Sequence, residues 1–149
     1  MKKEIFSEGL YHTIRVVLGF LFLFAAIHKI FEPSKFAVVI YNYRVMPVEL
    51  LNLVAIIVPW IEILVGMALL IGVWVEAAAL VLSGMTLFFI VLIISAIARG
   101  LNIECGCFSL DPEGSLVSWK RVLEDALMLI GGVYLMIHQL RAQLRLQPK

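Results

Sequence analysis

Long apolar stretches alternate with short polar segments along this chain. The third stretch is the most uniform, because residues 77–98 comprise 22 residues without a charged side chain. The second covers about residues 48–74, with one acid in its interior, Glu62, and the first covers about residues 13–31. The fourth covers about residues 119–140. A helix that crosses a membrane needs roughly 20 mostly apolar residues, so this pattern predicts four transmembrane helices.

Charged side chains mark the ends of two of these stretches. Arg15 precedes the uncharged centre of the first stretch, and His28 and Lys29 follow it. Long basic side chains can extend from such positions to the membrane interface. The fourth stretch carries four charges in its first turns, which shorten its apolar part: Lys120, Arg121, Glu124 and Asp125.

Composition supports a lipid environment. Hydrophobic residues make up 62% of the 149 residues and charged residues 15%, against about 25% charged in a typical soluble domain. We predict an all-α integral membrane protein, a four-transmembrane-helix bundle forming a single domain over residues 1–149. A short amphipathic segment, about residues 33–44, is expected to lie along the membrane surface. The net charge of +1, without a basic stripe, gives no indication of a nucleic-acid partner.

Two local features refine this picture. The chain starts with MKKE, but the apolar stretch that follows is long for a signal peptide and has no A-x-A cleavage site. We therefore expect the first helix to be retained. Small residues at Gly131-Gly132 and Ser83-Gly84 predict positions where helices pack closely.

The only cysteines of the chain, Cys105 and Cys107, lie in the polar segment IECGCFSLDPEG, residues 103–114. A disulfide requires Cα atoms roughly 4.4–6.8 Å apart and a restricted dihedral, and Gly106 relaxes the backbone between the two thiols. A disulfide across so short a loop stabilises little and is easier to reduce when strained. The spacing therefore favours a pair that cycles between dithiol and disulfide.

Two other uses of the pair stay open. Two thiolates supply half of a tetrahedral zinc site, and His28 lies at the same end of its helix, whereas a Cu(I) site would need fewer ligands. The cysteines could also be inert or structural. Within the pair, Glu104 disfavours a thiolate on its neighbour Cys105, so we expect Cys107 to be the more reactive thiol.

Several motifs, in order along the chain, resemble the MauE family of methylamine-utilisation membrane proteins, within the wider DoxX-like group. The most specific is Cys105-Gly106-Cys107-Phe108, where Ser109 replaces the glycine that usually follows in the family. The other motifs are Arg15 and Gly19, KIFEPSKF at residues 29–36, residues 43–47, Pro59-x-x-Glu62-x-x-x-Gly66, and Arg99-Gly100.

The resemblance implies a four-helix membrane protein that takes part in disulfide formation in, or redox maturation of, an extracytoplasmic partner, often beside a thioredoxin-like protein. It also suggests a membrane quinone as electron carrier. We predict a membrane thiol–disulfide oxidoreductase in which Cys105 and Cys107 exchange with a thioredoxin-like or client protein. The direction of electron flow stays open. The alternative is a non-enzymatic metal-binding or assembly subunit of a membrane complex.

The orientation of the protein in the membrane is predicted from the thiol chemistry, because the distribution of lysines and arginines does not favour either orientation. Four crossings place both termini on one side, and each side then carries six lysines and arginines. Reducing pools keep cytosolic thiols reduced, so an exchanging pair belongs outside the cytoplasm. We therefore expect a multi-pass protein of the cytoplasmic (inner) membrane, with cytoplasmic termini and with Cys105 and Cys107 on the extracytoplasmic side.

Glu62 is the remaining candidate site residue. An acid inside a spanning helix costs a few kcal/mol on insertion scales, so it should face the bundle interior. One reading makes it a proton acceptor in the thiol chemistry. The other makes it a carboxyl that bridges helices, with three candidate partners: Arg15, Lys29 and Arg99.

Overall fold

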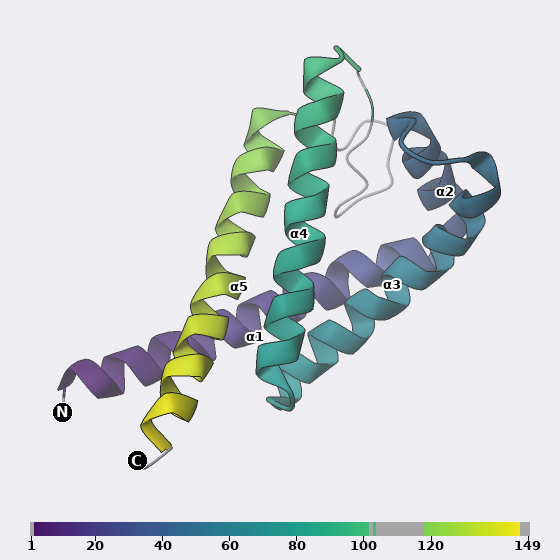
Figure 1. Ribbon diagram of the computed structural model, residues 1–149. Helices are drawn as coiled ribbons and strands as arrows, with labels where there is room; N and C mark the ends of the chain where they lie inside the picture. The colour runs from purple at the N-terminus through teal and green to yellow at the C-terminus, as the bar shows by residue number, and fades with distance from the viewer. Residues whose placement is uncertain (1, 102, 104–117, 147–149) are drawn as a thin grey trace.

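The computed structural model describes residues 2–101, 103 and 118–146 (Figure 1). Within these residues every regular element is an α-helix, which confirms the predicted all-α fold. In chain order the helices are α1 (Lys2–Phe31), α2 (Pro33–Tyr43), α3 (Val48–Ile71), α4 (Val75–Ala98) and α5 (Trp119–Leu146).

Four of these helices are long and apolar enough to cross a membrane, as the sequence pattern predicts. The candidate spans are Ser7–Phe31, Val48–Ile71, Val75–Ala98 and Trp119–Leu144. Each span turns large apolar side chains outward, among them Phe20, Leu64, Phe88 and Leu127. Water disfavours such a surface, whereas the hydrocarbon of a bilayer accepts it. The protein is therefore a multi-pass membrane protein.

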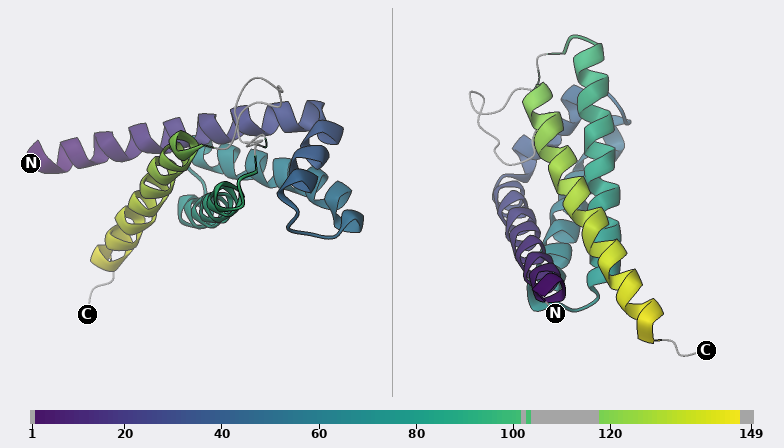
Figure 2. Two further views of the ribbon diagram at one scale, coloured as in Figure 1. Left: turned by 90° about the horizontal axis from the view of Figure 1, so that it is seen from above. Right: turned by 90° about the vertical axis from the view of Figure 1, so that its left-hand side faces the viewer.

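The helices are arranged as two pairs that cross one another. α1 lies along α3, and α4 lies along α5 (Figures 1 and 2). Both termini lie at the end of the molecule that holds the α3–α4 turn, and α2 lies at the opposite end (Figure 1). We call these the terminal end and the α2 end. The α2 end also holds the last turn of α4 and the first turn of α5, between which the chain runs through residues 104–117.

α1 begins at Lys2, well before the predicted start at residue 13. Its early turns contact α5. Hydropathy along the sequence does not reveal such a contact between distant segments. The ring of Tyr11 stacks on His138 with 4.5 Å between centroids, and Gln139 Nε2 donates a hydrogen bond of 2.7 Å to Tyr11 Oη. These contacts hold the helix together beyond its apolar centre.

The turn between α3 and α4 lies earlier in the chain than the sequence predicted, since α3 ends at Ile71 and α4 begins at Val75, whereas the expected helices ended at residue 74 and resumed at residue 77. Gly72 ends α3 in the left-handed region, at φ 87°, and its N–H donates to the carbonyl of Ala68. Glycine adopts this conformation without a steric penalty. A Cβ at Gly72 would also collide with the guanidinium of Arg15, so α1 packs directly on the turn.

Glycines let the backbones of α1 and α3 approach closely. A Cβ added to Gly66 would lie 2.9 Å from the carbonyl oxygen of Gly19, and one added to Gly19 would lie 3.1 Å from that of Gly66. Small residues serve membrane helices in this way because packing, rather than exclusion of water, holds the helices together. The register of α1 on α3 is thereby fixed where the centre of the first span meets the last third of the second.

The predicted close helix packing is confirmed at Gly131, Gly132 and Ser83 and is wrong at Gly84. A Cβ added to Gly132 would lie 2.5 Å from Ser83 Oγ, so these two residues mark a close approach. Gly131 instead faces α1, where an added Cβ would lie 3.2 Å from Leu18 Cδ1. Gly84 has nothing within 4 Å of an added Cβ, because it points away from the packed face.

The predicted amphipathic segment is a helix, α2, that starts with Pro33 and ends at Arg44 in the left-handed region, at φ 52°. Its apolar face packs on α3 and is buried at Phe36, Val39, Ile40 and Tyr43. Arg99, at the end of α4, donates from Nη2 to the carbonyl of Tyr43 at 2.8 Å. A basic side chain satisfies a terminal helix carbonyl in this way, and it joins the ends of α2 and α4.

Candidate functional site

An ion pair is buried where α1 meets α3. Lys29 Nζ lies 2.5 Å from Glu62 Oε1, and the two side chains are only 2% and 4% exposed. Lys29 comes from the last turn of α1. Glu62 lies one turn before Gly66 on α3, so the close approach of the two backbones brings both side chains together. Of the three partners considered for Glu62, the structure selects Lys29.

The other two candidate partners are engaged elsewhere. Arg15 packs against the α3–α4 turn at Gly72. Arg99 donates from Nε to the carbonyl of Ser95 at 3.2 Å and from Nη2 to Tyr43. Glu62 therefore bridges α1 and α3. A bridging carboxyl can still exchange a proton, and the catalytic role of Glu62 stays a prediction.

Aromatic rings enclose the lysine head group. Lys29 Nζ lies 5.1 Å from the ring centroid of Phe36 and 5.4 Å from that of Phe89. A cation over an aromatic face gains about 0.5–2 kcal/mol, more when it is removed from water. The rings belong to α2 and α4, so the ammonium group of α1 contacts three other helices once Glu62 of α3 is included. It is the central charge of the bundle.

A second acid reaches the same place from α5. Asp125 is 4% exposed and lines a cavity of about 30 Å³ together with Lys29, Glu62 and Thr86. Asp125 Oδ2 and Glu62 Oε2 are buried and have no hydrogen-bond partner among the described residues. We call Lys29, Glu62 and Asp125 the buried triad.

The sequence analysis missed Asp125, which was read only as one of the charges that shorten the fourth span. A signal was available. Asp125 precedes Gly132 by seven residues, and Leu135 follows three later, so all three share one helix face. These are the buried residues of α5 among those described. The sequence alone does not show that this face of α5 is the one that packs against the other helices.

The predicted thiol pair lies outside the described residues, because Cys105 and Cys107 fall in segment 104–117. The described neighbours of that segment belong to the α2 end. Ile103 packs on a cluster of buried residues that includes Phe36, Tyr43 and Ala96, and α5 begins at Trp119, less than two turns before Asp125. The thiols and the buried triad are thus connected through the first turns of α5.

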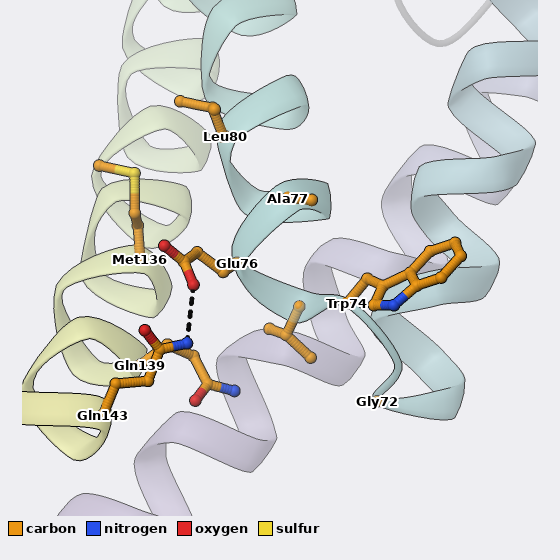
Figure 3. A pocket seen from close by; sticks show the side chains of 9 residues that line it. Gly72, Trp74, Glu76, Ala77, Leu80, Met136, Gln139 and Gln143 are labelled. Atoms are coloured by element: carbon orange, nitrogen blue, oxygen red, sulfur yellow. Dashed lines mark hydrogen bonds between the residues drawn. The ribbon is translucent and has the colours of Figure 1, made fainter. Parts of the chain in front are cut away.

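Away from the triad, the described helices line an apolar cavity and an open hollow. An apolar cavity of about 100 Å³ is enclosed by α2, α3 and α4 and is lined by Phe36, Phe89 and ten other residues, Tyr43 among them. A wider, open hollow of about 520 Å³ lies at the terminal end beside Trp74 (Figure 3). There Gln143 Nε2 donates to Glu76 Oε2 at 2.9 Å, which joins α5 to α4. Two of the rings that line the apolar cavity, Phe36 and Phe89, also enclose Lys29.

Among the described residues outside the spans, Tyr43 of α2 has a strongly shifted pKa. Burial, with a smaller contribution from the charge of Asp125, raises the pKa of Tyr43 to about 12. The phenol is only 4% exposed. It therefore stays protonated at every physiological pH.

The fold and the site define a class: a multi-pass helical membrane protein with a charged triad enclosed in its bundle. A family model described as methylamine utilisation protein MauE matches residues 7–138. The chain belongs to the MauE family, as its motifs indicated. The wider DoxX-like grouping stays a prediction.

Curated relatives carry the same family name. The chain is 30% identical over 117 residues to methylamine utilization protein MauE of Paracoccus denitrificans, covering 78% of this chain and 62% of that one. It is 34% identical over 114 residues to the protein of that name from Methylorubrum extorquens, covering 76% and 61%. The chain thus spans about three fifths of the length of these relatives. No solved structure matches the chain.

Proposed function

We propose that the protein is a membrane thiol–disulfide oxidoreductase that works in methylamine utilisation. The observation that carries the proposal is the Cys105-Gly106-Cys107 motif in the segment that joins α4 to α5. The names of the MauE relatives support the pathway. The partner in this proposal is a thioredoxin-like or client protein outside the cytoplasm.

The exchange proceeds through a mixed disulfide. A thiolate of the partner attacks the Cys105–Cys107 bond, a sulfur–sulfur bond forms between the proteins, and one cysteine of the pair leaves as a thiolate. The partner's second thiolate then attacks the mixed disulfide. The partner leaves oxidised, and the pair has taken up two electrons. The steps are reversible, so the reduction potentials of partner and carrier set the direction.

A membrane quinone is the proposed electron carrier. Reducing a quinone to a quinol consumes two electrons and two protons, and oxidation of the Cys105–Cys107 dithiol supplies both. The apolar cavity between α2, α3 and α4 supports this assignment, because quinones partition into lipid and the cavity is lined by Phe36, Phe89 and other apolar residues. Glu62 is the proposed proton acceptor in this step.

Single cysteine variants test the exchange directly. In the reverse direction a thiolate of the pair attacks a disulfide of the oxidised partner, and the second thiol of the pair resolves the adduct. Cys105→Ser or Cys107→Ser lacks that resolving thiol, so either variant, expressed with its native genomic neighbours, should give a higher-mass band on a non-reducing gel that dithiothreitol removes. We expect more adduct from Cys105→Ser, because it retains the more reactive thiol. The adduct's mass identifies the partner.

The contrary outcome is equally specific. If neither variant forms an adduct, and Cys105→Ser/Cys107→Ser complements as well as the unaltered protein, the exchange function is wrong. Loss of a stoichiometric bound metal in that double variant would instead support the metal-binding alternative.

A further inference from the structure

The buried triad contains more acid than an ion pair needs. One ammonium group, Lys29, is matched by one carboxylate, Glu62. Asp125 brings a second carboxyl from another helix into the same cavity. Each acid keeps one buried oxygen without a hydrogen-bond partner among the described residues. A purely structural bridge between α1 and α3 would require neither the second acid nor the spare oxygens.

Charge balance indicates what the extra acid does. With all three groups ionised, the triad would hold a net charge of −1 inside the bundle, where an unmatched charge is costly. Outside the triad, Arg121 of α5 interacts electrostatically with Asp125, but its guanidinium pairs with Glu124 at 2.6 Å, and that pair is 23% and 37% exposed. The remaining ionisable neighbour, Tyr43 of α2, is an acid and cannot supply the missing positive charge. One added proton balances the triad.

The cavity provides a path for that proton. A buried water needs a cavity of about 10–15 Å³ and two to four polar partners. The cavity measures about 30 Å³ and is lined by both acids, Lys29 and the hydroxyl-bearing Thr86. Lys29 has three N–H donors, of which the described contacts to Glu62 use one. Water can therefore connect the spare oxygens of Glu62 and Asp125.

We propose that Lys29, Glu62 and Asp125 form a proton-binding site, in which the two carboxyls share one proton that exchanges through water in the cavity between them. In the loaded state the site holds an ammonium, one carboxylate and one carboxylic acid. Release of the proton leaves two carboxylates beside the ammonium. No electrons move at this site.

The site deepens the proposed function, and its link to the thiols rests on that function. Oxidising a dithiol releases two protons, and reducing a quinone consumes two. Asp125 lies in the first turns of α5, directly after the cysteine segment in the chain. The triad is therefore placed to take up or deliver one of these protons.

Infrared spectroscopy of the purified protein in lipid nanodiscs tests the site without any activity assay. At neutral pH we expect a carboxylic-acid C=O band that shifts in D₂O and disappears as the pH is raised. The band should be lost in Asp125→Asn and in Glu62→Gln, because either change removes one of the sharing carboxyls. Should an amide variant fail to fold, Asp125→Glu and Glu62→Asp should fold and move the band.

Matched controls separate this site from surface acids and from the thiol chemistry. Glu124→Gln, next in sequence to Asp125 but more exposed, should keep the band. Cys105→Ser/Cys107→Ser should also keep it, even though thiol exchange is abolished. The proposal is overturned if the unaltered protein lacks the band, or if neither acid of the triad changes it. If the unaltered protein shows the band but no thiol exchange, the result would support the proton site and reject the oxidoreductase function.

Discussion

Lys29 is a residue whose head group normally reaches water, yet here it is 2% exposed and enclosed by two rings and a carboxylate. From the sequence it was expected to extend to the interface from the end of its helix. The interior position arises because α2 folds back over the end of α1 and brings Phe36 against the ammonium group. A side chain placed at the apparent edge of a span thus becomes part of the core.

Loss of Lys29 should be the most damaging change in the triad. Lys29→Met leaves two acids in the bundle without a cation, and breaking a buried pair costs about 3–5 kcal/mol. Glu62→Gln should cost less, because the amide oxygen still accepts from Lys29 and Asp125 still balances the charge. Thermal unfolding in detergent, followed by the fluorescence of the three tryptophans, measures both.

The control for this comparison is Lys120→Met, since Lys120 is exposed at the start of α5. That variant should unfold within a few degrees of the unaltered protein. Equal midpoints for Lys29→Met and Lys120→Met would contradict the central role of the buried ammonium.

Tyr43 should make the protein less stable in alkali. Its pKa is raised to about 12 in the folded protein, whereas an unfolded tyrosine titrates near 10. The protonated phenol of Tyr43 therefore contributes its full share to the free energy of unfolding below pH 10, and this contribution is lost as the pH rises towards 12. Unfolding midpoints measured across this range should fall more steeply for the unaltered protein than for Tyr43→Phe. Parallel curves would show that Tyr43 titrates normally.

At the scale of elements, the contact between α1 and α3 positions the site. The glycines at Gly19 and Gly66 set the separation of the two helices, and the register they impose brings Lys29 onto Glu62. α2 and α5 then add Phe36 and Asp125. The sequence predicted four spanning helices and a short amphipathic segment, but it did not indicate which helix faces would meet.

Gly66→Ala should destabilise the protein, because its new Cβ would lie 2.9 Å from the backbone oxygen of Gly19, which cannot rotate away. The helices must then separate, and the Lys29–Glu62 contact lengthens with them. We expect a lower unfolding midpoint in the same thermal assay. Gly84→Ala is the matched control, since nothing lies within 4 Å of its added Cβ and alanine favours a helix over glycine. A Gly84→Ala variant that loses as much stability would reject this packing explanation.

At the scale of the whole molecule, the two ends differ in character. The terminal end has the tight turn at Gly72 and a hollow lined by Trp74, Glu76 and glutamines. The α2 end has an extra helix, the apolar cavity and the attachment points of the cysteine segment. Two members of the triad, Lys29 and Asp125, come from helix turns at the α2 end, which is where the proposed thiol chemistry takes place, and Glu62 comes from the middle of α3.

Orientation in the membrane can be tested on a background without natural cysteines, Cys105→Ser/Cys107→Ser. Ser34→Cys places a thiol on exposed α2, and Val73→Cys places one on the exposed turn at the terminal end. In intact spheroplasts a membrane-impermeant maleimide should label Ser34→Cys and spare Val73→Cys until the membrane is opened. The reverse pattern would place the cysteine segment in the cytoplasm.

The sequence by itself determined the class of the protein. Apolar runs of about 20 residues are stable as helices in lipid because every backbone group is then satisfied within its own segment, so four spans could be read without tertiary information. It also singled out Glu62, since an acid in such a run must have a partner. Only the tertiary structure decided that the partner is Lys29 and that Asp125 joins them. It also decided that Gly66 packs closely against another helix whereas Gly84 does not. Those facts depend on how helices far apart in the chain are placed against one another, and hydropathy within a single segment carries no record of that placement.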